Sequence, residues 1–151
     1  VAIQNGGGVR ADLPQGPVTP RTIFNISPFD NLMVKLEMSG EALADVLDAG
    51  AGSGKAMTQV SGASFEYDRE APRGKRLSDL TVGGKPLDPK ASYKVVSLDF
   101  LVKGGDGYSP FDRATKKEFT EVLAREVLHQ CAQRQKTVER PEGGRMRPRR
   151  S

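Results

Sequence analysis

The chain contains several short segments in which apolar and polar residues alternate. The clearest is residues 31–38, where Leu32, Val34, Leu36 and Met38 share one side and Lys35 and Glu37 lie on the other. Such alternation is typical of a half-buried β-strand. Alternation or a short apolar run predicts further strands at residues 1–4, 60–67, 77–82, 85–87 and 93–98.

A helical spacing of apolar positions occurs twice. Ser39 is suited to an N-cap and precedes a predicted helix over residues 40–49. The segment Thr115-Lys116-Lys117-Glu118 has the residue types of a capping box and predicts the start of a second amphipathic helix. The inner side of the first helix carries Leu43, Val46 and Leu47, and that of the second carries Phe119, Val122, Leu123 and Val127.

Turn signals connect these elements. Thr19-Pro20 predicts the N-cap and first residue of a short helix over residues 21–25. Gly83-Gly84 predicts a two-residue hairpin, and the glycine-rich run over residues 50–55 predicts a flexible connector. Strands and helices interleave along the chain and hairpins occur as well, so the predicted fold class is α+β.

Composition and charge limit the possible partners. A chain of 151 residues, 36% of them hydrophobic, fits one compact core and has no apolar run long enough to span a membrane. The net charge of +4 is concentrated in residues 145–150, and no basic patch interleaved with aromatic residues supports base stacking. We therefore expect neither a nucleic-acid partner nor a membrane.

The rare residues argue against a metal site within this chain. His129 is the only histidine and Cys131 the only cysteine, so neither an internal disulfide nor a cluster of several histidine ligands can form. Nothing in the pattern positions His129 as a catalytic base, and a place on a helix surface is the simpler interpretation.

One segment combines chemistry with glycine-rich turns. An apolar strand leads into residues 97–108, where Phe100 is followed by Gly104-Gly105-Asp106-Gly107. Glycines permit the sharp turn that would hold Asp106 at a strand end, where a carboxylate can accept hydrogen bonds from two hydroxyl groups. A strand and glycine turn with Phe100 in the core is the alternative that this segment leaves open.

Two more segments repeat this design. Asn5-Gly6-Gly7-Gly8-Val9-Arg10 follows the first strand, and Ser27-Pro28-Phe29-Asp30-Asn31 is an aromatic-bearing turn. With residues 100–108, these motifs resemble, in order and approximate spacing, the C-terminal domain of the 5'-nucleotidase family. The resemblance runs from residue 1 to about Tyr108, and more loosely to Leu128.

The resemblance implies a four-layer α/β/β/α architecture and a set of substrate-binding residues. It implies that Phe29 and Phe100 sandwich the base and that Asp106 contacts the ribose hydroxyls. Asn5 and Arg10 match the asparagine and arginine of the glycine-rich motif, with Gly7 allowing close backbone approach. Taken singly, each residue also has an ordinary structural interpretation as core ring, turn former or surface ion-pair partner.

The resemblance also implies what lies outside this chain. We expect residues 1–132 to form a substrate-recognition domain and residues 133–151 a basic tail, disordered or with a short strand. Catalysis and two divalent metal ions would belong to an N-terminal metallophosphoesterase domain of the same protein, in the periplasm or outside the cell. No catalytic residue, metal or cofactor is therefore expected in this chain, which begins with Val1 inside a predicted strand.

Other functions remain open at this point. The fold could serve a non-enzymatic nucleoside-binding or interaction module. It could also belong to a related hydrolase that acts on a cyclic nucleotide or a thiosulfate ester, although Phe29 and Phe100 favour a substrate with a base.

Overall fold

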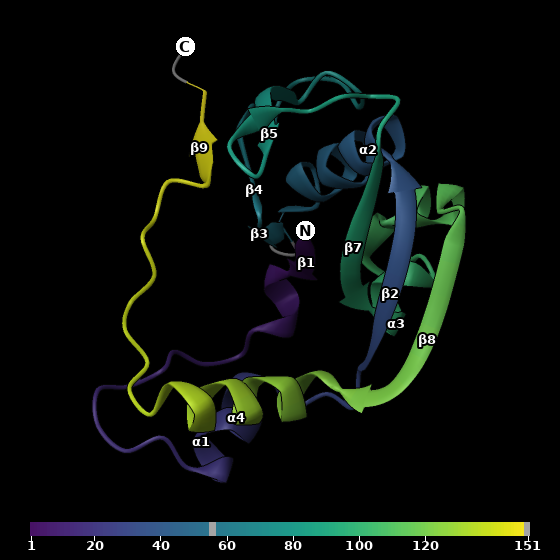
Figure 1. Cartoon of the computed structure of the whole chain (residues 1–151). Helices are drawn as coiled ribbons and strands as arrows, with labels where there is room; N and C mark the ends of the chain where they lie inside the picture. The colour runs from purple at the N-terminus through teal and green to yellow at the C-terminus, as the bar shows by residue number, and fades with distance from the viewer. Residues whose placement is uncertain (55–56, 150–151) are drawn as a thin grey trace.

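The structure is a computed structural model that describes residues 1–54 and 57–149. The larger sheet contains β1 (Ala2–Asn5), β2 (Leu32–Ser39), β3 (Thr58–Ser61), β7 (Ser92–Leu98) and β8 (Lys116–Leu123). Their order is β3-β1-β7-β2-β8 (Figure 1). β1 runs parallel to β7, whereas the other neighbouring strands are antiparallel.

The smaller sheet contains β4 (Ala63–Tyr67), β5 (Leu77–Val82), β6 (Lys85–Pro86) and β9 (Met146–Pro148). Its order is β6-β5-β4-β9, and β9 lies parallel to β4. Gly83 and Gly84 have φ angles of 58° and 77° between the paired strands β5 and β6. Positive φ at both positions suits a tight hairpin, and the predicted hairpin is confirmed.

The helices in the described part of the chain are α1 (Pro20–Ile26), α2 (Gly40–Ala51), α3 (Asp99–Val102) and α4 (Ala124–Gln135). α2 packs against strands of both sheets, and α1 and α4 lie side by side at the lower end of the view in Figure 1. Two sheets combined with these helices confirm the α+β class.

The hydrophobic core lies where α2 meets the sheets. The stripe predicted for α2 and most of the face predicted for β2 are buried, and only Leu32 at the start of the strand is half-exposed. The buried residues are Leu43, Val46 and Leu47 of the helix and Val34, Leu36 and Met38 of the strand. Burial of this kind contributes about 1.5–3 kcal/mol per large aliphatic side chain.

Two of the three predicted helix caps, those at Thr19 and Ser39, are present. The Thr19 hydroxyl accepts a hydrogen bond from the Thr22 N–H at 3.2 Å, and Pro20 is the first residue of α1. The Ser39 hydroxyl accepts from the Ala42 N–H at 3.2 Å at the start of α2. Each cap satisfies a backbone donor that the first turn of a helix leaves unpaired.

The single strand predicted at residues 60–67 is wrong. Gly62 has a φ of +80° and divides the segment into β3 and β4, which belong to different sheets. This left-handed conformation is accessible to glycine at little cost, so the chain can leave one sheet and enter the other within a single residue. The alternation itself is real in β4, where Ala63 and Phe65 are buried.

The helix predicted to start at Thr115 is also wrong. Residues 116–123 form β8, and the helix begins only at Ala124. Without β8, the backbone N–H and C=O groups on the outer side of β2 would be unpaired, and pairing with β8 satisfies them. The two strands are also joined by an ion pair between Lys35 of β2 and Glu118 of β8, at 3.0 Å. Phe119, expected on an inner helix face, is consequently half exposed.

The predicted connector is shorter in the structure, and the predicted tail contains a short strand. α2 continues through Gly50 and Ala51, so the helix includes the start of the predicted connector, and Lys55 lies outside the described residues. In the tail, β9 supplies a short strand, while residues 150 and 151 lie outside the described part. Within the described residues, no helix combines the length and the apolarity needed to cross a bilayer.

Candidate functional site

The strand order brings the three predicted motifs to one edge of the larger sheet. β1 and β7 are parallel with Ala2 opposite Val96, so both strands end at this edge. β2 runs antiparallel to β7 with Met33 opposite Leu98, so β2 begins there. The loops that carry Asn5, Phe100 and Phe29 are therefore neighbours, although they are far apart in sequence.

Asn5 and Asp106 are in direct contact. The Asn5 Nδ2 amide donates a hydrogen bond to Asp106 Oδ2 at 2.5 Å, across 101 positions of sequence. Asn5 is only 5% exposed, and among residues 1–54 and 57–149 its amide oxygen has no hydrogen-bond partner. A buried acceptor without a partner costs about 1–3 kcal/mol, so a ligand donor that reached it would gain free energy.

The glycine turn after β1 closes over Asn5. Gly6–Gly8 form a short 3₁₀ turn, and a β-carbon on Gly8 would lie 2.9 Å from the Asn5 amide oxygen. A side chain at position 8 would come too close to the Asn5 amide, so glycine at this position allows Asn5 to keep its observed conformation. The motif thus provides close packing at Gly8, in addition to the close backbone approach to a ligand expected at Gly7.

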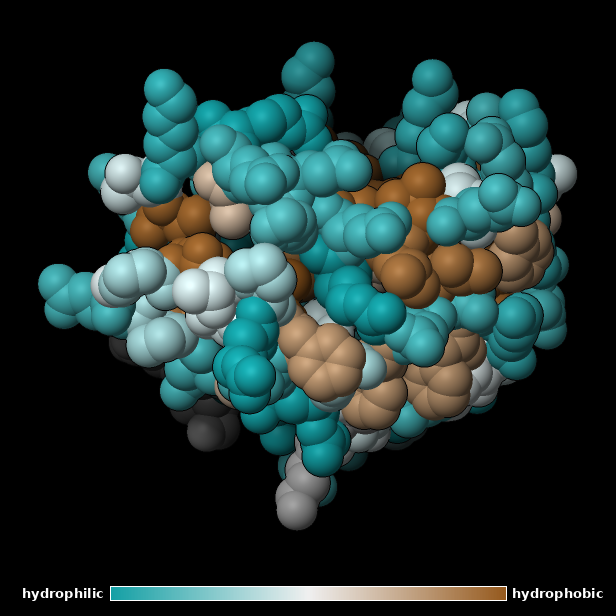
Figure 2. All heavy atoms as spheres, turned by 90° about the horizontal axis from the view of Figure 1, so that it is seen from below, coloured by the Kyte–Doolittle hydropathy of each residue, from teal (hydrophilic) through white to brown (hydrophobic). Residues whose placement is uncertain are grey.

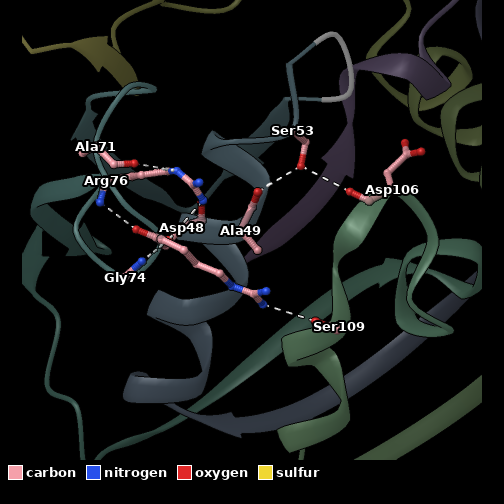
Figure 3. A network of polar contacts seen from close by, with 9 residues as sticks. Asp48, Ala49, Ser53, Ala71, Gly74, Arg76, Asp106 and Ser109 are labelled. Atoms are coloured by element: carbon pink, nitrogen blue, oxygen red, sulfur yellow. Dashed lines mark hydrogen bonds and ion pairs between the residues drawn. The ribbon is translucent and has the colours of Figure 1, made fainter.

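Asp106 lies in a left-handed turn. Its φ is 52°, and Gly104 and Gly107 on either side have φ angles of 93° and 82°. The Ser53 hydroxyl has one proton and two carbonyl acceptors within reach, Ala49 at 2.9 Å and Asp106 at 3.2 Å, and Figure 3 shows the Asp106 carboxylate pointing away from Ser53. Ser53, just past the C-terminal end of α2, thus contacts the turn at its backbone, and Asp106 stays exposed.

Phe100 is held on the outside of the same turn. It is the second residue of α3, its side chain is 43% exposed, and a β-carbon on Gly105 would lie 2.5 Å from the tip of its ring. Gly105 is therefore required for close approach of the ring. Asp99 accepts a hydrogen bond from the Leu32 N–H at 3.0 Å, which joins α3 to the start of β2. Phe100 is not a core ring.

Arg10, Gly7 and Phe29 form a second contact group. The Arg10 guanidinium lies 6.0 Å from the centre of the Phe29 ring, and its Nη1 donates to the Gly7 carbonyl at 3.4 Å. The Arg10 N–H also donates to the Ile26 carbonyl at 2.9 Å, which joins this loop to the end of α1. Phe29 is 41% exposed, so both predicted aromatic residues reach the surface.

The six predicted residues share one edge but not one network. Within residues 1–54 and 57–149, no hydrogen bond or ion pair joins the Asn5–Asp106 pair to the Arg10–Phe29 pair. Figure 2 shows the face seen from below, on which apolar side chains lie exposed among polar ones. The arrangement offers exposed aromatic rings, one carboxylate, one guanidinium and one unpaired amide oxygen.

A buried tyrosine supports the Asp106 turn from inside. The Tyr108 hydroxyl lies 2.6 Å from the Thr58 hydroxyl, and both side chains are fully buried. Burial is the main cause that raises the pKa of Tyr108 to about 12; the hydrogen bond with Thr58 lowers the pKa in part, and the Asp106 carboxylate makes a smaller upward contribution. Tyr108 is therefore neutral at physiological pH and anchors the C-terminal side of the turn.

The α2 helix that precedes Ser53 is fastened by its own polar contacts. The Asp48 carboxylate accepts from the Gly74 N–H at 2.7 Å and the Arg76 N–H at 2.8 Å, and it lies 3.6 Å from the Arg76 guanidinium (Figure 3). Neither Ser53 nor Asp48 was found by sequence reasoning. Their partners are 26 to 53 positions away, and no local motif signals such contacts.

Among the described residues, no three His, Cys, Asp or Glu side chains are grouped so that they could hold a metal ion. The resemblance assigns the two divalent ions to another domain, so we derive no chemistry through them here.

Comparison with protein families matches residues 1–113 to the family described as 5'-nucleotidase, C-terminal domain. The Silent protein UshA(0) of Salmonella typhimurium is 35% identical over 135 residues, which cover 87% of this chain and 24% of that protein. This chain therefore spans about a quarter of the length of that relative.

Solved structures agree with this family. The 5'-nucleotidase precursor from Thermus thermophilus superposes with a TM-score of 0.91 at 31% identity, covering 97% of this chain and 31% of that one. The NAD nucleotidase NadN of Haemophilus influenzae has a TM-score of 0.88 at 23% identity over 99% of this chain and 30% of its own, and shows the fold alone. The chain belongs to the 5'-nucleotidase C-terminal domain family.

Proposed function

We propose that this domain recognises a nucleotide for a 5'-nucleotidase-type phosphoric monoester hydrolase. Phe29 and Phe100 stack on the two faces of the base, and Asp106 accepts hydrogen bonds from the ribose hydroxyls. Asn5 contacts the edge of the base, and Arg10 binds ribose or phosphate oxygens with its planar fork.

The observation that carries this proposal is the state of Asn5. Its amide nitrogen donates to Asp106, while its amide oxygen is buried and has no hydrogen-bond partner in the part of the chain that the structure describes. Folding normally avoids such an atom, and a bound ligand that donates a hydrogen bond would satisfy it. The exposed rings of Phe29 and Phe100 at the same sheet edge support a flat aromatic ligand, since any base can stack on them.

Hydrolysis is assigned to a second domain. We infer that residues 1–132 act together with an N-terminal metallophosphoesterase domain of the same protein, which would supply two divalent metal ions. In such a protein this domain binds and orients the nucleotide, and the other domain cleaves the phosphate ester. A periplasmic or extracellular location is part of the same proposal and rests on the family.

The base clamp is tested by titrating the 151-residue chain with AMP and with ribose 5-phosphate, followed by NMR chemical shifts. Phe29→Ala and Phe100→Ala should each reduce the binding free energy of AMP by about 1–3 kcal/mol, because each removes one stacking surface. Ribose 5-phosphate has no base, so its affinity should be unchanged.

Phe119→Ala is the matched control. This ring is also half exposed, but it lies on β8 against Lys103 and outside the proposed clamp. It should leave the affinity for AMP unchanged. Equal losses for AMP and ribose 5-phosphate in the Phe29 and Phe100 variants, or wild-type protein that binds neither compound, would refute the proposed function.

A further inference from the structure

Arg125 lies outside all of the predicted motifs, yet it contacts the loop that carries Phe29. It is the second residue of α4, and its Nη1 donates a hydrogen bond to the Phe29 carbonyl at 3.1 Å. The same guanidinium forms an ion pair with Asp30 and lies 5.7 Å from the centre of the Phe24 ring. Its side chain is 25% exposed, so these contacts are partly shielded from water.

The loop that receives these contacts is also contacted by Arg10, whose guanidinium lies over the exposed ring of Phe29, whereas Arg125 binds the backbone of the loop. Phe29 and Asp30 fall between the end of α1 and the start of β2, and both residues are exposed. The Ala124 N–H donates to the Asn31 carbonyl at 2.9 Å, so the first two residues of α4 both bind the loop. Ala124 binds the loop through its backbone and Arg125 through its side chain. The Arg125 guanidinium contacts the Phe24 ring, the Phe29 carbonyl and the Asp30 carboxylate.

The chemistry of these contacts suits arginine specifically. A planar guanidinium can donate to a carbonyl and to a carboxylate in fixed directions while one of its faces rests on an aromatic ring. Lysine carries a point charge on a flexible stem and would keep the attraction to Asp30 but lose the combined geometry. Fixing the Phe29 carbonyl restricts the backbone from which the exposed ring projects.

We propose that Arg125 is a positioning residue for the Phe29 half of the base clamp. It acts from α4 by holding the loop of residues 29–30, and it does not contact the nucleotide. The inference rests on the proposed function, because the orientation of Phe29 affects affinity only if this ring stacks on the base. A pre-oriented ring gives up less conformational freedom when the base binds, and affinity rises accordingly.

The test compares Arg125→Ala and Arg125→Lys in the 151-residue chain, with AMP and ribose 5-phosphate as the titrants. Arg125→Ala should weaken the binding of AMP about five- to tenfold, which is about the cost of ordering one side chain when the ligand binds, and leave the binding of ribose 5-phosphate unchanged. Arg125→Lys should show a smaller loss with the same selectivity. If Arg125→Ala fails to fold, Arg125→Lys carries the test.

The matched control is Arg134→Ala, on the same helix. Among the described residues, the Arg134 side chain donates only to the Gln130 carbonyl of the same helix, at 3.4 Å, so Arg134→Ala should not change either affinity. The double variant Phe29→Ala with Arg125→Ala separates positioning from general stability. Once the ring is gone, removing Arg125 should have no further effect on AMP.

The possible outcomes separate the two proposals. If Phe29→Ala selectively weakens the binding of AMP while Arg125→Ala does not, the positioning role is wrong, but the proposed base clamp is not contradicted. Equal loss for both titrants in Arg125→Ala, or additive losses in the double variant, also overturns the positioning role. If Phe29→Ala itself affects both titrants equally, the proposed function fails first.

Discussion

Asp106 is bound at its backbone and at one carboxylate oxygen, and each contact has a different consequence. Ser53 contacts the carbonyl, and the left-handed turn sets the direction of the side chain. Asn5 orients the carboxylate through Oδ2, while the residue as a whole stays exposed. In the proposed function, this oriented carboxylate accepts hydrogen bonds from the ribose hydroxyls.

Asp106→Asn tests this sugar contact with little change to the fold. Asparagine tolerates the left-handed φ of 52°, and its amide oxygen can still accept from Asn5, so the free energy of unfolding should change by less than about 0.5 kcal/mol. A hydrogen bond to a charged acceptor is worth about 1.5–3 kcal/mol, and AMP should therefore bind at least about tenfold more weakly.

The control for Asp106→Asn is the 2'-deoxy form of the same nucleotide. It lacks one hydroxyl and should lose less affinity than AMP when the carboxylate is replaced. Equal losses for the two sugars, or a variant with clearly lower stability in urea, would return Asp106 to a purely structural role in the turn.

At the scale of elements, α2 joins the core to the candidate site. Its buried stripe packs against the sheets, and residues near its C-terminal end meet Thr58, Tyr108 and the Asp106 turn. Gly50 is the point of closest approach, because a β-carbon there would lie 1.7 Å from the Thr58 hydroxyl and 2.6 Å from the Tyr108 hydroxyl.

Gly50→Ala sets two effects against each other. Alanine favours a helix over glycine by about 0.5–1 kcal/mol, whereas overpacking a buried site costs about 1–3 kcal/mol. The steric effect should prevail, because both contacted hydroxyls are fully buried and bonded to one another. Urea unfolding should therefore show a net loss of stability.

Gly143→Ala provides the comparison for Gly50→Ala. A β-carbon at Gly143 would meet nothing within 4 Å, and its backbone carries no positive φ. Its stability should stay within about 0.5 kcal/mol of the parent protein. A Gly50→Ala variant as stable as Gly143→Ala would show that α2 can shift away from Thr58 at no cost.

At the scale of the whole molecule, a buried tyrosine makes stability depend on alkaline pH. The pKa of Tyr108 is about 12 in the folded protein against 10 for an ordinary tyrosine. Below pH 10 both states keep the proton and this residue contributes no slope. Above pH 10 the unfolded chain ionises first, so the stability that Tyr108 contributes is lost as the pH rises towards 12.

Chemical unfolding of the parent protein and Tyr108→Phe between about pH 9 and 12 checks this dependence. The parent should lose stability more steeply than the variant, because phenylalanine has no proton to lose. The variant should be less stable at neutral pH, since Thr58 loses a buried partner. It is the slope that tests the pKa, and parallel pH profiles would contradict the raised value.

Local patterns alone determined much of this protein. The alternation in β2, the stripe of α2, the caps at Thr19 and Ser39 and the Gly83-Gly84 hairpin depend on residues a few positions apart. Helical and strand periods are local properties, so the sequence carries them directly. The motifs that contain Asn5, Phe29 and Asp106 are also short runs of residues, but the expected position of Asp106 at a strand end is wrong, because α3 lies between the end of β7 and the Asp106 turn.

Only the tertiary structure decided the rest. Residues 116–123 form a strand because they pair with β2. The continuous alternation over residues 60–67 is divided at Gly62 because β3 and β4 belong to different sheets. The bond between Asn5 and Asp106 spans 101 positions, and that between Arg125 and Phe29 spans 96. Such contacts follow from the order and direction of strands in the sheet, which no local period in the sequence encodes.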